Sequence, residues 1–309
     1  MGLFGKKEAC AICGGKVKAL FPWKIEGHLI CNSCHGNVDL PEGVENNMTM
    51  DEFRAYLSFR EENGALRHQF KTTQQVDFGW LDDKFLFDMN NGLLCMDKNL
   101  NKTIFEAKHI QSFVIREDSA PIYEGSAAGL VCYPSYVPDR VMAMEPQLHQ
   151  IRMQEQMQRN MERMVDMRDG KRDYDVHFGS NYHDIPEPFQ KFVIEIHFQQ
   201  HPYWSFYTAD MGGPTFSNTS PDANAYLRDY NNKVGIMDQL ARALMELAFP
   251  GAGMQQAGAT DPVMSTQAVV TPTMSVDAVS EIQRFKALVD QGILTEEEFA
   301  AKKRQLLGI

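Results

Sequence analysis

The sequence predicts an α+β protein with a small cysteine-rich ribbon at residues 1–48 and a mixed central body at residues 49–249. A flexible tether at residues 250–276 then leads to a helical hairpin at residues 277–309. Three observations predict this order. Two C-x₂-C pairs lie close to the amino terminus, short segments of strand-like alternation follow them, and an amphipathic segment comes last, after a stretch without Lys or Arg.

Length and charge limit the classes of protein to which the chain can belong. At 309 residues, with 43% apolar and 23% charged residues, it is long enough for one sizeable core and too apolar to be disordered throughout. No stretch reaches the ~18 uninterrupted apolar residues of a membrane helix, and residues 1–7 lack the apolar core of a signal peptide. We therefore expect a cytoplasmic protein with no membrane contact.

The amino-terminal segment holds two C-x₂-C pairs separated by seventeen residues: Cys10, Cys13, Cys31 and Cys34. This spacing is typical of a short hairpin that closes a tetrahedral thiolate site around one Zn²⁺. Because four thiolates leave no open coordination position, the ion is predicted to be structural and not catalytic. Two disulfides are the alternative, which a reducing cytosol disfavours.

Other residues with metal-binding side chains lie outside this pattern. His28 and His35 are close to the second pair, but four cysteines at proper spacing already complete the site, so both are interpreted as bystanders. Cys95 and Cys132 belong to no motif and are predicted to be small buried apolar residues. We therefore expect one metal site only.

The ribbon is also the one plausible surface for an anionic partner. The whole chain has a net charge of −11, which argues against non-specific binding of a phosphate backbone, whereas residues 1–35 hold five Lys against two Glu, a net charge of +3. Aromatic and basic side chains that could stack on and neutralise a single strand are Lys16, Lys18, Phe21, Trp23 and Lys24. The same residues suit the small core of a ribbon, so contact with a protein is favoured over nucleic acid.

A helix is predicted directly after the ribbon. Thr49 is a good N-cap and Glu52 lies three residues on, the arrangement of a capping box, and Gly64 is expected to end the helix. An antiparallel meander follows at about residues 70–128. Its clearest part is a hairpin at residues 84–96 with Asn-Asn-Gly at the turn, and further strands are predicted at residues 103–106, 110–116 and 122–125.

Residues 145–168 form a long predicted helix with a methionine on every turn. Met153, Met157, Met161 and Met164 recur at spacings of four, four and three, which places them in one stripe. A peptide-binding groove or a soft-metal site is one interpretation. A core-facing or self-pairing helix is favoured, because thioether side chains mainly fill irregular apolar gaps.

A strand pair and a helix are predicted to complete the body at residues 190–249. Residues 192–198 alternate as a strand and residues 201–206 are expected to be its partner. Ser220-Pro221-Asp222 is predicted to open a helix with Ser220 as the N-cap. Five apolar side chains are expected to pack this helix onto the strands: Tyr226, Tyr230, Ile236, Leu240 and Leu244.

The carboxyl-terminal segment reads as two short helices on a tether. Residues 250–276 are built largely from Pro, Gly, Ala, Ser, Thr, Gln and Met, a composition that cannot offset a backbone entropy of ~1–2 kcal/mol per residue. Beyond them, Gly292 is predicted to stop the first helix, and Thr295 with Glu298 forms a capping box for the second.

Three segments resemble known domains. Cys-x₂-Cys-Gly-x-Lys after an MGLFGKK start, followed by His-Leu-Ile-Cys-Asn-Ser-Cys, resembles the four-cysteine ribbon domain of unknown function that opens many bacterial and phage-encoded proteins. This resemblance covers roughly residues 8–60 and implies bound zinc and no known activity. Residues 103–118, with their Ile-x-Ser-Phe step and acidic turn, resemble the bacterial pleckstrin-homology-like meander, which implies a platform that binds proteins.

The third resemblance lies at residues 279–308. The string Ile-x-x-Phe-Lys-Ala-Leu-Val-Asp-Gln-Gly-Ile-Leu-Thr-Glu-Glu-Glu-Phe is similar to the short C-terminal domain called SHOCT. At about thirty residues, the hairpin is below the size that sustains a core alone, so it is expected to bury its apolar face against another copy, the body or a partner.

An enzymatic function is disfavoured. One region gathers acid–base side chains, namely Asp173, Asp175, His177, His183, Asp184, His197 and His201, but their spacing matches no catalytic motif and loop histidines are the plainer interpretation. The sequence therefore predicts a non-enzymatic, zinc-binding scaffold or adaptor that forms a homo-oligomer through its hairpin and binds a protein partner. Nucleic-acid binding through the ribbon is the alternative.

Overall fold

The computed structural model of the chain describes residues 9–17, 22–36, 38–78, 84–97, 100, 102–168 and 185–256. It divides into two compact units, Met1–Ala259 and Thr260–Ile309, and every described residue lies in the first unit. The hairpin predicted at residues 277–309 and most of the tether lie outside the described residues. None of the described helices is both long and apolar enough to cross a membrane.

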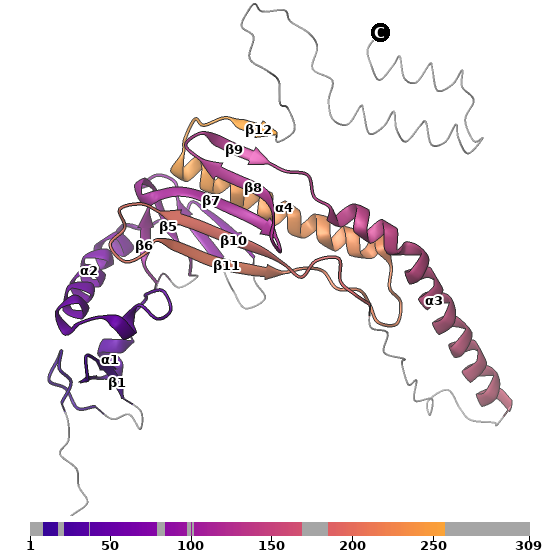
Figure 1. Cartoon of the computed structure of the whole chain (residues 1–309), viewed down its shortest axis with the longest axis horizontal. Helices are drawn as coiled ribbons and strands as arrows, with labels where there is room; N and C mark the ends of the chain where they lie inside the picture. The colour runs from indigo at the N-terminus through magenta and orange to yellow at the C-terminus, as the bar shows by residue number, and fades with distance from the viewer. Residues whose placement is uncertain are drawn as a thin grey trace, which may run out of the picture. The chain divides into compact units, whose positions relative to one another are not determined.

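The amino-terminal segment forms a small hairpin and a one-turn helix (Figure 1). Strand β1 (Trp23–Ile25) pairs antiparallel with β2 (His28–Ile30), and helix α1 (Asn32–His35) follows. Gly27 lies in the turn at φ +81°, a conformation that glycine adopts at little cost. The strand pair that the sequence predicts between the two cysteine pairs is confirmed.

Helix α2 (Met50–Gln69) begins at the predicted N-cap, after the short helix η1 (Glu45–Asn47). The Glu52 N–H donates to the Thr49 hydroxyl at 3.3 Å, and the Thr49 N–H donates to the Glu52 carboxylate at 2.8 Å. The capping box is therefore confirmed, with two otherwise unpaired N–H groups satisfied reciprocally.

The prediction that Gly64 ends α2 is wrong. The helix continues for five more residues, and the Phe70 N–H closes it on the Leu66 carbonyl at 2.9 Å. A glycine inside a helix costs about 1 kcal/mol relative to alanine. Contacts on both sides offset this cost, because Asn63 bonds the neighbouring sheet and Leu66 packs against its buried residues.

A four-stranded antiparallel sheet follows, in the order β3-β4-β5-β6. Its strands are β3 (Gln74–Asp77), β4 (Lys84–Asp88), β5 (Leu93–Cys95) and β6 (Ile104–Glu106). The predicted hairpin joins β4 to β5: Gly92 has φ +63°, and the Asp88 carboxylate accepts hydrogen bonds from the N–H and the amide of Asn91. The turn residues therefore act as the sequence indicates.

A second sheet has six strands in the order β11-β10-β7-β8-β9-β12. The strands are β7 (Ile110–Glu117), β8 (Ala120–Ser126), β9 (Gly129–Cys132), β10 (Lys191–Phe198), β11 (Phe206–Gly212) and β12 (Met254–Gln256). The single meander expected at residues 70–128 is therefore split between two sheets at the short helix η2 (Ala107–His109). β12 runs parallel to β9, so the first residues of the expected tether are part of the sheet.

The bounds of the partner strand predicted at residues 201–206 are wrong, because residues 201–205 form a loop and the antiparallel partner of β10 is β11, which begins at Phe206. The imidazole Nδ1 of His201 accepts hydrogen bonds from the N–H groups of Tyr203 and Trp204, which closes a turn. The Phe198 N–H then donates to the Ser205 carbonyl. Local bonding by a histidine side chain overrides the strand propensity of the aromatic residues here.

Helix α4 (Ala223–Ala248) packs against strands of both sheets and lies across one face of the six-stranded sheet (Figure 1). Its N-cap is Asp222 and not Ser220, since the Asp222 carboxylate accepts the Ala225 N–H at 2.6 Å. Four of the five predicted packing residues are buried and Ile236 is partly buried against the same core. Gly125 permits this packing, because a Cβ there would lie 2.2 Å from the Phe113 ring.

Helix α3 (Val137–Arg168) begins eight residues before the predicted start and contains Pro146. Its first half packs into the core through Val137, Val141 and Leu148. The methionine stripe of the second half does not face the core, so the core-facing interpretation is wrong. The four methionines are among the most exposed large apolar side chains of the described residues.

Asn63 of α2 covers the free edge of the four-stranded sheet. β6 is the last strand of that sheet, and its Ile104 N–H donates to Asn63 Oδ1 at 2.9 Å while Asn63 Nδ2 donates to the Ile104 carbonyl at 2.8 Å. Asn63 is 5% exposed, so these backbone groups have no water to replace it.

We therefore expect Asn63→Ala to lower the free energy of unfolding by about 1–3 kcal/mol, the cost of leaving buried polar groups unpaired. Chemical denaturation of the two proteins measures the difference. Ser58→Ala, at an exposed position of the same helix, is the matched control and should change stability little. Equal stability of the Asn63 variant and the natural chain would contradict this role.

Candidate metal centre

The structure brings the four predicted cysteines together. Their sulfur atoms all lie within 4.8 Å of one another, and the Cys13 and Cys31 sulfurs are 3.6 Å apart. A tetrahedral site with metal–sulfur bonds of about 2.3 Å has sulfur–sulfur edges of about 3.8 Å. The cluster therefore has the size that a four-coordinate divalent ion requires, and among the described residues it is the group of side chains placed to hold one.

The first cysteine pair is held in a tight turn. The Cys10 N–H donates to the Gly15 carbonyl at 2.8 Å, and the Gly14 N–H donates back to the Cys10 carbonyl at 2.9 Å. Gly14 has φ +69°, and a Cβ at Gly15 would stand 3.1 Å from the Cys13 sulfur. Glycine at both positions lets the backbone close around the sulfurs without a clash.

The second pair stands at the start of α1. Cys31 is the residue before the helix, and the His35 N–H donates to the Cys31 carbonyl at 3.0 Å. The Cys31 N–H points to the other pair and donates to the Cys10 sulfur at 3.3 Å. Backbone donors aimed at sulfur stabilise thiolates and orient them toward a shared ion.

The electrostatics of the cluster call for a cation. Although burial raises the pKa of Cys10, backbone N–H donors from Cys13, Cys31 and Ile12 lower it overall, to about 6. The pKa of Cys31 is also lowered, chiefly by the Cys34 N–H, whereas burial and the neighbouring sulfurs raise the pKa of Cys34. Four thiols this close cannot all ionise by themselves, and a divalent ion supplies the charge that lets them do so.

The alternatives to a four-sulfur site find no support in the described residues. All six cysteines are free thiols, so the disulfide interpretation is wrong. His35 stacks on Trp23 with 3.6 Å between ring centres, and its Nε2 lies 3.5 Å from the Glu45 carboxylate. His28 is exposed on β2. Both histidines are bystanders to the sulfur cluster, as predicted.

The two remaining cysteines lie outside the sulfur cluster. Cys95 is fully buried in β5, and burial raises the pKa of its thiol to about 12, which keeps it protonated and unreactive. Cys132 in β9 is partly buried against the main core. The prediction of a small buried apolar residue is therefore confirmed for Cys95 and holds in part for Cys132.

The sulfur cluster is part of a small core that extends beyond the two cysteine pairs. Cys10 and Cys31 pack with Ile25 and Ile30 of the hairpin and with Phe53 of α2. The Tyr56 ring of α2 belongs to the same core and meets Tyr203, from the loop before β11, edge-to-face at 5.0 Å. An ion held by the four sulfurs would therefore support the position of α2 as well as the ribbon.

Sequence reasoning missed the residues that connect the ribbon to the body. The Asp39 N–H donates to the Tyr56 hydroxyl at 2.5 Å, and the Asp39 carboxylate accepts from the Thr103 N–H at 2.6 Å and from its hydroxyl at 2.7 Å. Tyr203 completes this connection through its ring contacts with α2. These contacts join residues far apart in the chain, so no local pattern could have indicated them.

The acid–base residues considered for catalysis are only partly described. Asp173, Asp175, His177, His183 and Asp184 lie outside the described residues. His197 on β10 lies 2.5 Å from the Glu195 carboxylate. His201 is in a different environment, among the rings of Phe59, Phe105 and Phe198, with His109 at 5.6 Å, so the structure does not bring the two described histidines into one site.

Two parts of the chain match known domain models. Residues 8–56 match a domain of unknown function, DUF4428, and residues 280–307 match the short C-terminal domain, SHOCT. The chain carries a DUF4428 domain and a SHOCT domain. The DUF4428 match ends inside α2 at Tyr56, which is the last fully buried residue that α2 contributes to the ribbon core.

No match to the chain was found among curated proteins or among solved structures. The two domain matches confirm the resemblances proposed for the four-cysteine ribbon and for the carboxyl-terminal segment. The pleckstrin-homology-like resemblance of residues 103–118 has no such support and stays a prediction.

Removal of one sulfur should release the metal. We expect the natural chain to hold one divalent ion and Cys13→Ser to hold far less than one. The variant should also unfold at a lower temperature, because ion binding stabilises the fold by about 4 kcal/mol when the free ion concentration is a thousand times the Kd. Elemental analysis and thermal unfolding measure both effects. Cys132→Ser, outside the DUF4428 domain, should keep one equivalent, and full metal content in the Cys13 variant would refute the four-sulfur site.

Protonation of His201 should destabilise the fold. Burial, followed by nearby His109, lowers the pKa of His201 to about 4, below its unfolded value of about 6.5, while Glu106 acts weakly in the opposite direction. Between pH 4 and pH 6.5 the unfolded chain therefore binds more protons at His201 than the folded chain does. The contribution of neutral His201 to the free energy of unfolding is full above pH 6.5 and is lost as the pH falls toward 4.

Denaturant midpoints of the natural chain and His201→Gln at pH 7 and pH 5 test this linkage. We expect the natural chain to lose more stability between the two pH values than the variant does. Burial lowers the pKa of His109 too, so some pH dependence should remain in the variant. An equal loss of stability between pH 7 and pH 5 in both proteins would show that His201 does not titrate in this way.

Proposed function

We propose that this chain is a non-enzymatic zinc-binding scaffold that assembles through its SHOCT segment and through helix α3, and that binds a protein partner. Zinc is the ion that best suits the DUF4428 domain, because four thiolates in a tetrahedron of this size are the usual structural zinc set. Such a site holds a fold together and leaves no coordination position for substrate.

The observation that carries the assembly proposal is the exposed methionine stripe on the second half of α3. Met153, Met157, Met161 and Met164 are 42% to 65% exposed. At about 100° per residue they lie on the side of the helix opposite the buried Leu148 and Ile151. An apolar stripe that faces away from its own core is the surface expected of a contact with another molecule.

A second copy of α3 is the occupant that this stripe suits. Over residues 150–161 the described side chains beside it are uncharged, namely Gln150, Gln154 and Asn160, so close approach of an identical stripe over this length would desolvate no charge. Flexible thioether side chains adapt to one another without a fixed pattern of interlocking shapes. A C₂ pair would bury both stripes at once.

The absence of an enzymatic role rests on how the described histidines are used. His201 holds a turn in a ring cluster, and His197 is paired with Glu195 on the sheet. Each has a packing or pairing role that explains its position. These contacts support a binding function for the body over acid–base chemistry.

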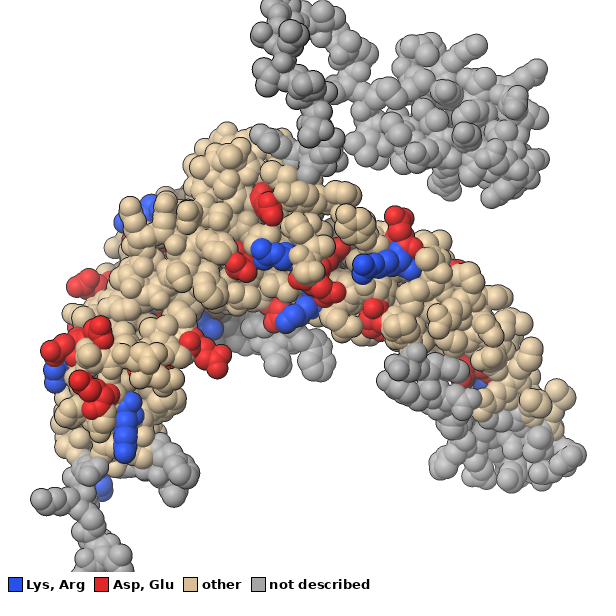
Figure 2. All heavy atoms as spheres, viewed as in Figure 1, with Lys and Arg blue, Asp and Glu red and all other residues tan. Residues whose placement is uncertain are grey.

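The nucleic-acid alternative has less support. The ribbon core extends beyond residue 35, and residues 1–48 together contain five Lys and five Asp or Glu, so the module has no net charge. Trp23, the proposed stacking residue, is already stacked on His35. Acidic and basic side chains are also mixed over the visible face of the described residues (Figure 2). These features favour a protein partner over a phosphate backbone.

The assembly proposal predicts a change in mass when either contact is removed. Replacing Met157 and Met161 together by Ser should weaken self-association at least tenfold, because each buried methionine contributes about 1.5–3 kcal/mol. A chain that stops before Asp277 should likewise fall to a lower oligomeric state. Light scattering across a concentration series measures both.

Met254→Ser is the matched control, since Met254 is 60% exposed but lies on β12, away from α3. It should leave the mass unchanged. A monomeric natural chain, or full assembly by both the double variant and the truncated chain, would refute the scaffold proposal.

A further inference from the structure

A cleft of about 440 Å³ lies between the second half of α3 and the loop that precedes α4. It is on a different face of α3 from most of the methionine stripe. Polar side chains with hydrogen-bond donors line it, among them Arg152, Arg159, Arg163, Asn160, Thr219 and Ser220. All carry hydrogen-bond donors, so the cleft is distinct in chemistry from the apolar stripe beside it.

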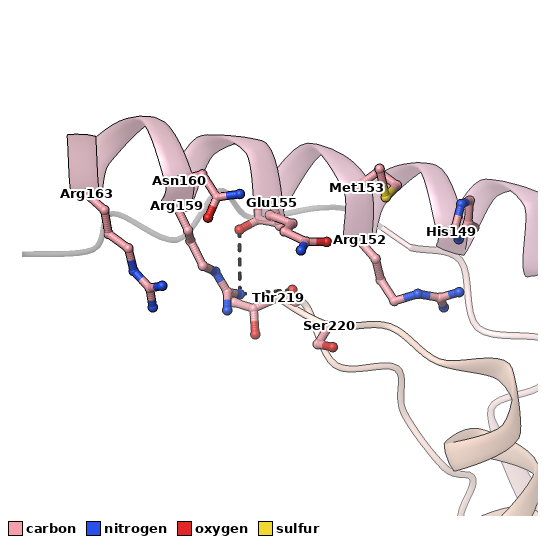
Figure 3. Close-up of a pocket in the computed structure, with 10 residues that line it drawn as sticks. His149, Arg152, Met153, Glu155, Arg159, Asn160, Arg163, Thr219 and Ser220 are labelled. Atoms are coloured by element: carbon pink, nitrogen blue, oxygen red, sulfur yellow. Dashed lines mark hydrogen bonds and ion pairs between the residues drawn. The ribbon is translucent and has the colours of Figure 1, made fainter. Parts of the chain in front are cut away.

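The three arginines share one face because of their spacing. Intervals of seven and four residues return to the same side of an α-helix. Figure 3 shows the result, with Arg152, Arg159 and Arg163 extending to the same side of the helix, toward the segment that carries Thr219 and Ser220.

Two of the guanidinium groups are held in place by the loop. Arg152 donates to the Pro221 carbonyl at 2.5 Å and to the Glu145 carboxylate at 2.5 Å. Arg159 donates to the Thr219 carbonyl at 3.2 Å and lies 3.9 Å from the Glu155 carboxylate. A guanidinium has five N–H donors, so each retains donors for a ligand and has already lost much of its rotational freedom.

Arg163 supplies the uncompensated charge. Within the described part of the chain no ion pair joins it to an acidic side chain, whereas Glu145 and Glu155 offset Arg152 and Arg159. Its guanidinium extends freely in the view of Figure 3. Among the described residues, the cleft therefore has preorganised donors at its centre and an excess positive charge at one end.

The loop adds donors of a second kind. The Ser220 and Thr219 side chains bear hydroxyl groups on the wall opposite Arg159. They come just before the N-terminus of α4, a 26-residue helix whose macrodipole places partial positive charge at this end. Guanidinium, hydroxyl and amide donors around one space are the set that binds tetrahedral oxyanions.

We propose that this cleft binds a small phosphorylated molecule, with a phosphoryl group between Arg159 and Arg163. A volume of about 440 Å³ exceeds what one phosphate ion fills and lies within the range of sites for organic ligands, about 300–1,000 Å³. The phosphoryl oxygens accept from the guanidinium forks, and the remainder of the molecule lies toward Arg152.

Calorimetric titration of the full-length chain at low ionic strength tests the site, with inorganic phosphate, tripolyphosphate and adenosine triphosphate as probes. We expect binding that weakens as salt is added. Tighter binding of adenosine triphosphate than of tripolyphosphate would support an organic ligand, and equal or weaker binding would refute the organic part of the proposal. Binding of none of the three probes would overturn the proposal.

Arg163→Gln should weaken binding at least tenfold and should fold normally, since Arg163 is exposed. Arg159→Lys keeps the charge but loses the planar fork, and should fall between the natural chain and the Gln variant. Arg54→Gln, an exposed arginine of α2 paired with Asp51, is the matched control and should bind as the natural chain does.

Equal binding by Arg163→Gln and the natural chain, or equal loss in Arg54→Gln, would place the anion elsewhere and refute the cleft. Light scattering of Arg163→Gln keeps this inference separate from the assembly proposal. Its mass should be that of the natural chain, because Arg163 lies outside the methionine stripe.

Discussion

The convergence of four sulfur atoms determines how the first third of the chain is organised. Residues 9–36 contain few large apolar side chains, and the sulfurs of Cys10 and Cys31 are themselves part of the core on which Phe53 and Tyr56 pack. A divalent ion would neutralise thiolates that otherwise repel one another, so we expect its binding to be coupled to the packing of this core. Phe53 and Tyr56 link α2 to the same core.

α2 transmits this constraint to the body. Its first half belongs to the ribbon core, and its second half covers the edge of the four-stranded sheet through Asn63. α4 then packs against both sheets, with Leu240, Ala241 and Leu244 fully buried. Two helices therefore connect the ribbon hairpin with the two sheets of the body.

α3 differs from both of these helices because only its first half packs its apolar side chains into the main core of the described structure. Beyond Ile151 one of its faces bears arginines that bond the loop before α4, and another bears exposed methionines. A polar face and an apolar face on one projecting helix can serve two partners of different chemistry without competition. In both of our proposals, recognition therefore lies on α3 of the body and not on the ribbon.

The sequence by itself determined the features that depend on neighbouring residues: the four-sulfur site, the Thr49–Glu52 capping box, the Asn-Asn-Gly hairpin and the two terminal domain matches. Each follows from short-range geometry that the residue types enforce. Tertiary structure alone decided the division of the meander into two sheets, the continuation of α2 through Gly64 and the outward direction of the methionine stripe. The spacing of apolar residues along a helix or strand shows which of them share a face. What that face packs against depends on segments that are far away in the sequence.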